Sequence, residues 1–370
     1  MPEGGLSIRW PDPPVEQEIR LYDYKINSVR AFTAGNNINR LVFDSKTPRF
    51  GIVTTGKAYL DTLQALTNLG IDANEADRLG LRLLKIGLPW PLEINIVQKF
   101  AEDLEEILVV EEKRAVIEGQ LKDILYNLEA AKRPRVFGKC NEHGEQLLPS
   151  AGELTPSIIA SVIAKRLKPF YHSDAIKKHL RFLDDKETEL SNTLTDVERV
   201  PYFCSGCPHS SSTRIPEGSR AAAGIGCHYM ALWMDRSTET FTHMGGEGAN
   251  WIGQSSFTET PHIFTNLGDG TYFHSGILAI RAAVAARVSI TYKILYNDAV
   301  AMTGGQSLDG PLDVATIAKQ VHAEGVQRIA IVSDEPKKYP TSNNWPPNVT
   351  FHERHDMDRL QRELRAYTGV

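Results

Sequence analysis

Residues 261–299 read PHIFTNLGDGTYFHSGILAIRAAVAARVSITYKILYNDA and contain one complete strand, turn, helix and strand unit. Residues 261–267 are mostly apolar and run into a glycine turn, which is typical of a short buried strand. Residues 276–287 are rich in alanine with larger apolar residues at helical spacing, and residues 288–295 are β-branched and aromatic. Two strands joined through a helix lie parallel in one sheet, so this stretch predicts an α/β fold.

Polar residues follow both predicted strands. In an open parallel sheet, ligands bind at the carboxyl ends of strands, and a glycine turn that opens a helix leaves backbone N–H groups free for an anion. Asp269 and Asn297 add oxygen ligands of the kind that Mg²⁺ shares with phosphate groups. We therefore expect a diphosphate with Mg²⁺ at this edge, and the alternative is an ordinary surface turn. The turn consists of Gly268, Asp269, Gly270 and Thr271.

The spacing of these residues resembles the fingerprint of thiamine diphosphate (TPP) enzymes, Gly-Asp-Gly followed after the next strand by Asn. The resemblance implies that Asp269, Asn297 and the main-chain carbonyl of Ala299 hold Mg²⁺. The fingerprint often ends in two Asn, and here Tyr296 stands in the first of these places. The Met-Thr-Gly-Gly-Gln run at 302–306 is also similar to the family pattern.

The first half of the chain also alternates strands and helices, which implies a second parallel α/β sheet. Before it, residues 1–45 look like an arm or linker, with a possible strand at 8–10 and an amphipathic helix at 16–36. No Gly-x-Gly-x-x-Gly follows the first strand, so a dinucleotide fingerprint is absent. The predicted strands are 49–54, 81–86, 107–111 and 135–137, and the predicted helices are 56–69, 94–104, 115–128 and 155–167.

Three runs in this half resemble the transketolase C-terminal-like domain of the indolepyruvate and related 2-oxoacid:ferredoxin oxidoreductases. They are VTTGK at 53–57, KIGLPWPL at 85–92 and VVEEKR at 109–114. The acidic and basic residues at 111–114 are either a solvated helix start or a contact to a partner or substrate. The expected domains are an arm at 1–45, the transketolase C-terminal-like domain at 46–168, a charged connector at 169–198 and the TPP-binding domain at 199–370.

Three cysteines precede the TPP turn. Cys204 and Cys207 have Cys-x-x-Cys spacing on a glycine turn, and Cys227 follows in a Gly-Cys pair. Such thiolates could bind zinc with His209 or His228 completing the set, form a redox dithiol, or bind no metal. In the 2-oxoacid:ferredoxin oxidoreductases, similar cysteines bind a [4Fe–4S] cluster, which implies Cys204, Cys207 and Cys227 as three ligands. Because no Cys follows Cys227, the fourth ligand must come from a His or another chain, or the cluster is absent.

A second glycine-rich segment, Gly245, Gly246 and Glu247, resembles a cofactor-binding segment of the same family. Adjacent glycines let the backbone approach a ligand closely, and the alternative is a flexible loop. His274, just past the TPP turn, either faces the reacting carbon or is an ordinary exposed histidine.

Composition excludes several other classes of protein. The net charge of −5 over 370 residues argues against a general nucleic-acid binder. No apolar run is long enough for a membrane helix, and the N-terminus has no signal-peptide pattern. Four cysteines in so long a chain do not form a disulfide framework, so a reducing, cytoplasmic setting is expected.

Taken together, the resemblance implies oxidative decarboxylation of a 2-oxoacid, indolepyruvate or another arylpyruvate, to an acyl-coenzyme A, with ferredoxin accepting the electrons. The pyrimidine-binding and γ-type domains of the family are absent from the sequence, so we expect a fragment or one subunit of a dimeric assembly. Two alternatives are a non-catalytic TPP-binding subunit and a TPP-dependent decarboxylase or synthase without electron transfer. No proton-transfer residue is assigned.

Overall fold

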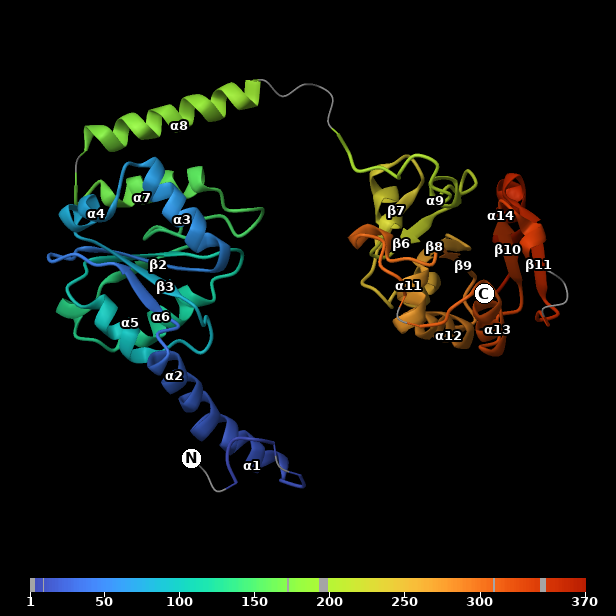
Figure 1. Cartoon of the computed structure of the whole chain (residues 1–370), viewed down its shortest axis with the longest axis horizontal. Helices are drawn as coiled ribbons and strands as arrows, with labels where there is room; N and C mark the ends of the chain where they lie inside the picture. The colour runs from blue at the N-terminus through green and yellow to red at the C-terminus, as the bar shows by residue number, and fades with distance from the viewer. Residues whose placement is uncertain (1–3, 9, 172, 193–198, 309, 340–343) are drawn as a thin grey trace. The chain divides into compact units, whose positions relative to one another are not determined.

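The computed structural model describes residues 1–370 except 1–3, 9, 172, 193–198, 309 and 340–343 (Figure 1). The chain divides into two compact units, Met1–Thr195 and Asp196–Val370.

The first unit is built on a five-stranded sheet in the order β1-β3-β2-β4-β5, in which all pairs are parallel except that of β1 with β3. Helices cover both faces of this sheet (Figure 1). The strands are β1 (Arg40–Phe43), β2 (Phe50–Thr55), β3 (Leu81–Ile86), β4 (Glu106–Val110) and β5 (Arg135–Phe137). The main helices are α3 (Gly56–Asn68), α4 (Ala73–Leu79), α5 (Ile94–Ala101), α6 (Ile117–Tyr126) and α7 (Pro156–Leu167). The expected α/β class is therefore confirmed.

Side-chain alternation along the central strand explains the two layers. On β2, Phe50 and Ile52 face the cluster formed with α3, α4 and α7, whereas Val53 faces the cluster formed with α5 and α6. All three side chains are buried, as a parallel strand covered on both faces requires. The predicted strand at 81–86 and the predicted strand at 135–137 match β3 and β5 residue for residue.

The arm differs from its prediction at both ends. Residues 40–43 were expected in the arm but form β1 at the edge of the sheet. This strand pairs antiparallel with β3, with Leu41 opposite Leu84. Ile8 and Trp10 are not in a strand. The predicted helix at 16–36 is confirmed as three consecutive helical segments, α1 (Pro14–Ile19), η1 (Arg20–Lys25, a π-helix) and α2 (Ile26–Gly35).

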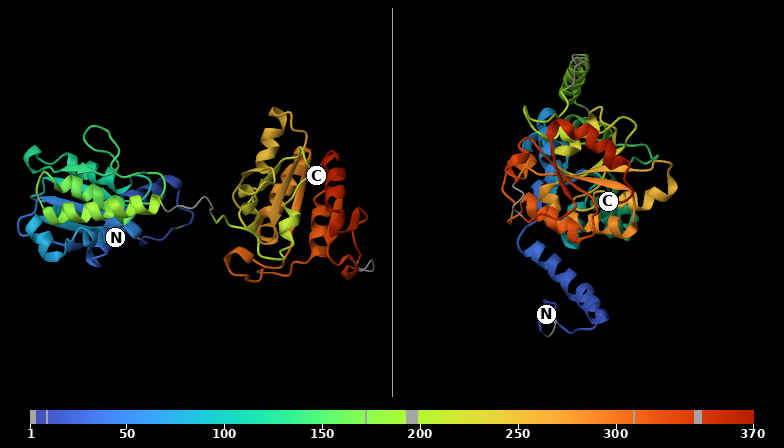
Figure 2. Two further views of the ribbon diagram at one scale, coloured as in Figure 1. Left: turned by 90° about the horizontal axis from the view of Figure 1, so that it is seen from above. Right: turned by 90° about the vertical axis from the view of Figure 1, so that its right-hand side faces the viewer.

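The charged connector contains a long helix that the sequence analysis did not predict. Helix α8 (Asp174–Asn192) packs against α7, with Ile176 buried in the core and Leu180 and Leu183 packed on it. It lies over the same face of the sheet as α7 in both views (Figures 1 and 2). Residues 193–198 of the connector lie outside the described residues. The helix was not predicted because most of its residues are charged or polar and only one narrow stripe of its surface is apolar.

The second unit contains a parallel four-stranded sheet in the order β7-β6-β8-β9 and a parallel pair, β10 and β11. Its strands are β6 (Ala221–Ala223), β7 (Thr238–Phe241), β8 (Ile263–Gly268), β9 (Ile290–Leu295), β10 (Ile329–Ser333) and β11 (Val349–Glu353). Its long helices are α12 (Ile277–Ala286), α13 (Val314–Ala323) and α14 (Met357–Arg365). The predicted unit at 261–299 is confirmed, whereas β6, β7 and β11 were not predicted.

A cavity of about 380 Å³ separates the two sheets of the second unit. It is lined by residues 290–296 and 328–334 and by apolar residues of α13 and α14. Within the described part of the chain, β9 pairs only with β8 and β10 only with β11. The facing edges of β9 and β10 therefore border the cavity.

The titration of Lys293 on β9 is expected to make the stability of the second unit depend on pH. Its Nζ lines the cavity and donates to the carbonyl of Arg214 at 3.1 Å and to Oε1 of Gln361 at 3.0 Å. Removal from water lowers the pKa of Lys293 to about 7. A lysine in the unfolded chain has a pKa of about 10.4. Between about pH 7 and pH 10 the unfolded chain therefore binds more protons than the folded chain, and the free energy of unfolding rises with pH.

We expect Lys293→Met to flatten this rise, measured by urea unfolding across the same pH range. The matched control is Lys319→Met, an exposed lysine on α13, which should keep the wild-type slope. An unchanged slope in Lys293→Met would show that another group causes the pH dependence.

No helix among the described residues combines the length and the apolar character that a bilayer span requires.

Candidate functional site

The centre of the candidate site is the carboxylate of Asp269, which directly follows β8 and is 3% exposed. Its Oδ1 accepts the N–H of Gly270 at 2.8 Å. Its Oδ2 accepts the N–H of Asn297 at 2.8 Å and that of Asp298 at 2.7 Å. One buried carboxylate thus ties the end of β8 to the loop that follows β9, and the two polar segments predicted to meet do so.

The donor chemistry at this turn fits a hard divalent cation. An ionised carboxylate offers about four acceptor positions, and three of those of Asp269 are used by backbone N–H groups. One position stays available for an ion. The Asn297 side chain is exposed, and its Oδ1 accepts the N–H of Ala299 at 3.1 Å. Within the described residues, no group of three His, Cys, Asp or Glu side chains is arranged to hold a metal, so a bound ion would need main-chain, amide or ligand oxygens as well.

The turn also opens a helical segment. Helix α11 (Asp269–Thr271), the π-helical η5 (Tyr272–Gly276) and α12 follow one another without a break. Backbone N–H groups at such a helix start, together with the helix dipole, favour a phosphate group. Gly276 is required by packing, because a Cβ at this position would lie 2.9 Å from Cδ1 of Leu267. His274, by contrast, is exposed and its Nδ1 pairs with Oγ of Ser275 at 2.7 Å.

Two buried histidines that the sequence analysis considered only as zinc ligands lie close to the Asp269 turn. Both ring nitrogens of His209 and Nε2 of His228 are buried and have no hydrogen-bond partner among the described residues. A Cβ on Gly268 would lie 3.7 Å from Cε1 of His228. Burial is the main cause that lowers the pKa of His209, while Asp269 opposes the shift. Burial, with His209 as a further cause, lowers the pKa of His228 to about 4.

Unpartnered buried nitrogens are costly unless a ligand or water completes them. His209 and His228 therefore offer two hydrogen-bonding groups beside the turn that would hold a diphosphate. The signal in the sequence was their position directly after Cys207-Pro208 and Cys227. Their approach to Asp269 is a tertiary contact, because Gly268 ends β8 whereas His228 lies in the short helix η3 (Cys227–Trp233) that follows β6.

The second glycine segment packs against the same turn. Gly245 has a left-handed backbone with φ of 89°, and a Cβ on it would overlap Oγ of Ser275 in η5. Glu247 is fully buried and its Oε2 accepts the N–H of Gly245 at 2.7 Å. Burial raises the pKa of Glu247, and its Oε1 has no hydrogen-bond partner in the described part of the chain. Gly246 lies against the ring of His243. Glu247 thus braces the glycine turn from within the unit.

The three cysteines lie near one another. The N–H of Cys207 donates to the carbonyl of Cys204 at 3.0 Å across a turn in which Gly206 has φ of 78°. The pKa of Cys227 is raised by burial, and Cys207 and Cys204 add to this shift. The thiols are free, and within the described residues they are not arranged as a ready metal site. Cys140 belongs to the other unit.

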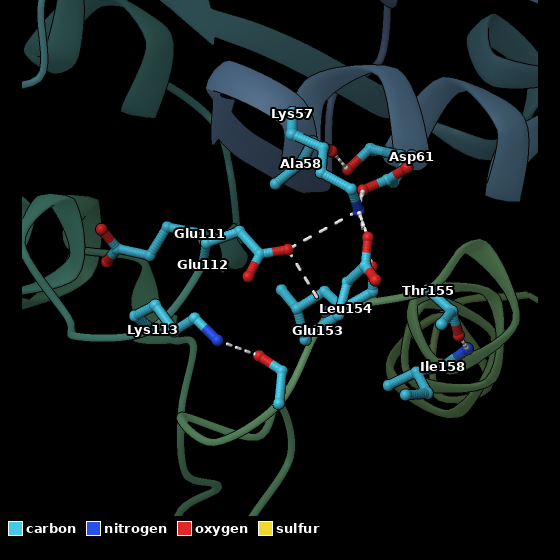
Figure 3. A network of polar contacts seen from close by, with 12 residues as sticks. Lys57, Ala58, Asp61, Glu111, Glu112, Lys113, Glu153, Leu154, Thr155 and Ile158 are labelled. Atoms are coloured by element: carbon cyan, nitrogen blue, oxygen red, sulfur yellow. Dashed lines mark hydrogen bonds and ion pairs between the residues drawn. The ribbon is translucent and has the colours of Figure 1, made fainter. Parts of the chain in front are cut away.

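The corresponding edge of the first unit is closed by its own chain (Figure 3). In open α/β sheets, ligands bind at the point where the strand order reverses, next to the carboxyl ends of the two central strands. In this sheet that point lies between β2, which is followed by β3 on one side, and β4, which is followed by β5 on the other. Lys57 after β2 donates to the carbonyl of Leu154 at 3.0 Å and pairs with Glu153 at 2.9 Å. After β4, Glu112 accepts the N–H of Leu154 at 3.2 Å, and Lys113 donates to the carbonyl of Gly152.

Glu111 has a structural role at this edge. Its carboxylate accepts the N–H groups of Val116, Ile117 and Glu118 at 2.9–3.0 Å and so caps the start of α6. Together with the contacts of Glu112 and Lys113, this favours the first of the two interpretations of residues 111–114, a helix start. The first unit is accordingly not the centre of the candidate site.

Comparison with known proteins gives the following matches. Residues 40–190 match the family model described as "Indolepyruvate oxidoreductase domain". The chain is 28% identical over 283 residues to indolepyruvate oxidoreductase subunit IorA of Thermococcus kodakarensis, covering 71% of this chain and 40% of the relative. It is 26% identical over 331 residues to subunit IorA of Methanothermobacter thermautotrophicus, covering 84% of this chain and 48% of the relative. The chain thus spans less than half the length of these curated relatives.

Two solved structures are also similar in part. The 2-oxoglutarate:ferredoxin oxidoreductase from Magnetococcus marinus is 17% identical with a TM-score of 0.36, covering 48% of this chain and 64% of that one. A putative thiamin diphosphate-dependent enzyme from Mycobacterium smegmatis is 11% identical with a TM-score of 0.32, covering 93% of this chain and 63% of that one.

Proposed function

Because this chain belongs to the indolepyruvate:ferredoxin oxidoreductase family, we propose that it supplies the diphosphate- and Mg²⁺-binding half of a TPP-dependent 2-oxoacid oxidoreductase. The single observation that carries this proposal is the Asp269 carboxylate, which joins the ends of two neighbouring strands and keeps one acceptor position available. The proposed reaction converts an arylpyruvate such as indolepyruvate to an acyl-coenzyme A.

Each residue of the turn has a defined part in this proposal. Asp269, Asn297 and the carbonyl of Ala299 would hold Mg²⁺, and the N–H of Thr271 at the helix start would face the diphosphate. Gly268 and Gly270 would shape the turn, since the N–H of Gly270 already donates to Oδ1 of Asp269. His209 and His228 would donate to the diphosphate oxygens through buried ring nitrogens that have no partner among the described residues. When bound, TPP would supply carbanion chemistry toward a keto carbon, and these residues would supply its position and its electrostatic environment.

The glycine segment limits the volume beside the cofactor. Gly245 and Gly246 let the backbone approach the turn, and Glu247 fixes their conformation through its bond to the N–H of Gly245. Because Glu247 is fully buried, we assign it this bracing role within the proposed cofactor-binding segment. A pyrimidine-binding domain and a γ-type domain, supplied by other chains or other parts of the protein, complete the proposed enzyme.

We also propose a [4Fe–4S] cluster held by Cys204, Cys207 and Cys227. Their mutual proximity supports this proposal, and electron transfer to ferredoxin requires a centre that accepts single electrons. The fourth ligand then comes from a histidine or another chain. The four free cysteines agree with a reducing compartment, and we propose the cytoplasm. The fourfold domain division of the sequence analysis is kept as a proposal, with the first boundary moved before β1.

The cluster proposal leads to a direct prediction. Anaerobically purified wild-type protein is expected to be brown. The Cys204→Ala variant should lose most of its iron and sulfide, because this chain would then supply two cysteine ligands to the cluster instead of three. Iron and acid-labile sulfide per chain are the measurement. Cys140→Ala, which removes a thiol from the other unit, is the control and should keep the colour. A colourless, iron-free wild-type preparation from anaerobic cells would contradict the cluster.

The proposed function is tested by calorimetric titration of the chain with TPP, with and without Mg²⁺. Heat that depends on Mg²⁺ supports the site. If no heat is found, the titration is repeated with the pyrimidine-binding partner chain, and absence of binding there as well overturns the proposal. Arylpyruvate oxidation by the same mixture distinguishes an oxidoreductase from a subunit that only binds TPP.

A further inference from the structure

The arm of the first unit presents an unpartnered helix. Segments α1, η1 and α2 run continuously over residues 14–35 and extend away from the sheet of their own unit (Figure 1; right-hand view of Figure 2). Large apolar side chains are exposed along its whole length, with Val15 and Tyr22 64% exposed and Phe32 62% exposed. The exposed set is Val15, Ile19, Leu21, Tyr22, Tyr24, Val29 and Phe32. A helix with apolar side chains on several sides is normally covered by another element.

The base of the arm is fixed to the body of the unit. Nε of Arg30 donates to the carbonyl of Leu92 at 3.1 Å, and a Cβ on Gly87 would overlap main-chain atoms of Ile38. Leu92 belongs to the loop that carries Trp90, whose side chain is exposed. The helix therefore has a defined direction relative to the sheet of the first unit. Exposed Trp90 lies near its base, in addition to the exposed Phe32 of the helix itself.

Charges along the arm are segregated. The acids Glu16, Glu18 and Asp23 all lie in its first half, whereas Lys25 and Arg30 lie in its second half. The one basic residue of the first half, Arg20, is buried, and its two Nη atoms already contact Asp12 and the carbonyl of Gly5. The solvent-facing charge is therefore acidic toward the N-terminal end and basic toward the C-terminal end.

We propose that this arm is a self-association surface, on which the helix pairs antiparallel with the same helix of a second copy of the chain. An antiparallel pair places the acidic half of each helix beside the basic half of the other, whereas a parallel pair places like charges together. Such a two-fold interface is self-complementary and closes at a dimer.

The charge pattern also fixes the register. With the two-fold axis at Tyr24, Glu18 lies at about the same height along the axes as Arg30 of the second copy. Asp23 then lies level with Lys25, and the apolar Ile19 lies level with Val29. Exposed apolar residues between these charges supply the buried area of the interface, and the charges set its direction. A lipid surface fits less well, because the acids in the first half oppose anionic headgroups.

The first test measures self-association of the full chain by sedimentation equilibrium over a wide range of concentrations. A monomer–dimer equilibrium is expected, and the Ile19→Lys/Tyr22→Lys variant should weaken it at least tenfold. The control is Tyr126→Lys/Phe257→Lys, which places two lysines at exposed aromatic positions outside the arm and should leave the equilibrium unchanged. A wild-type chain that stays monomeric, or a dimer that the arm variant does not weaken, overturns the proposal. A monomer that instead co-sediments with anionic vesicles would identify a lipid-binding arm.

The second test determines the orientation by cross-linking with a short bis-maleimide. Gln17→Cys chains mixed with Ala31→Cys chains should form the mixed 17–31 product, because these positions lie level in the antiparallel register. Either variant alone should cross-link no more than wild type, which controls for the exposed Cys140 and Cys204. Strong self-linking at position 17 and at position 31 would show a parallel pair and overturn the register.

Discussion

Replacing Asp269 with asparagine is expected to weaken Mg²⁺-dependent TPP binding by at least a hundredfold while the second unit stays folded. The substitution removes the negative charge but leaves an oxygen that can accept the N–H groups of Asn297 and Asp298. Mg²⁺ strongly prefers a carboxylate to an amide at such a position, so the ion and the diphosphate it bridges are lost together. Titration calorimetry measures the binding, and thermal unfolding with and without TPP and Mg²⁺ measures the stability.

A neighbouring residue provides the matched control. Asp298→Asn makes the same chemical change one position along, at an exposed side chain with a left-handed backbone that asparagine tolerates. We expect this variant to bind TPP as wild type does. Asp269→Ala should go further, because the N–H groups of Asn297 and Asp298 lose their acceptor, at a cost of about 1–3 kcal/mol. If folded Asp269→Asn binds TPP normally, the metal is held elsewhere.

The second large effect is expected in the first unit, where Glu106→Ala should lower the free energy of unfolding by about 3–5 kcal/mol. Glu106 begins β4 and is 1% exposed. Arg166 on α7 binds both of its carboxylate oxygens, with Nε–Oε1 and Nη2–Oε2 distances of 2.6 Å. Arg135 at the start of β5 adds a contact at 3.0 Å. Removal of Glu106 leaves the buried Arg166 guanidinium with the partly exposed carboxylate of Glu142 and the ring of Phe137.

Two comparisons separate the ion pair from general sensitivity of this region. Glu105→Ala removes the adjacent carboxylate, which pairs with Arg49 at the surface, and should cost at most about 1 kcal/mol. The double variant Glu106→Leu/Arg166→Met removes both buried charges and should recover most of the stability lost in Glu106→Ala. Urea unfolding, with hydrogen exchange at β4 to assign the transition, measures all three. Equal losses in Glu105→Ala and Glu106→Ala would contradict a dominant buried pair.

Much of the secondary structure could be predicted because its causes are local. Residues 50–55 carry no charged side chain and residues 81–86 are apolar at four of six positions, so both runs are typical of strands. The leucines of the helix between them do not share one buried face, because Leu66 is 1% exposed and Leu60 is 64% exposed. Strand β6 was missed because Ala221–Ala223 has low strand propensity; it is a strand because β7 and β8 flank it and small residues fit where it is covered. Strand β1 was missed because its pairing with β3 involves residues that are 40 to 45 positions apart in the chain.

For the candidate site, the sequence by itself determined the Gly268–Thr271 turn and Asn297, since both follow strands whose carboxyl ends must share one edge of a parallel sheet. Only the tertiary structure decided that the Asp269 carboxylate holds the loop after β9, that unpartnered His209 and His228 lie beside it, and that Glu247 is buried as a brace. The physical reason is the range of the interactions. Hydrophobic periodicity and turn residues act between neighbours in the chain, whereas burial and hydrogen bonding of a side chain depend on which distant strands the fold places next to it.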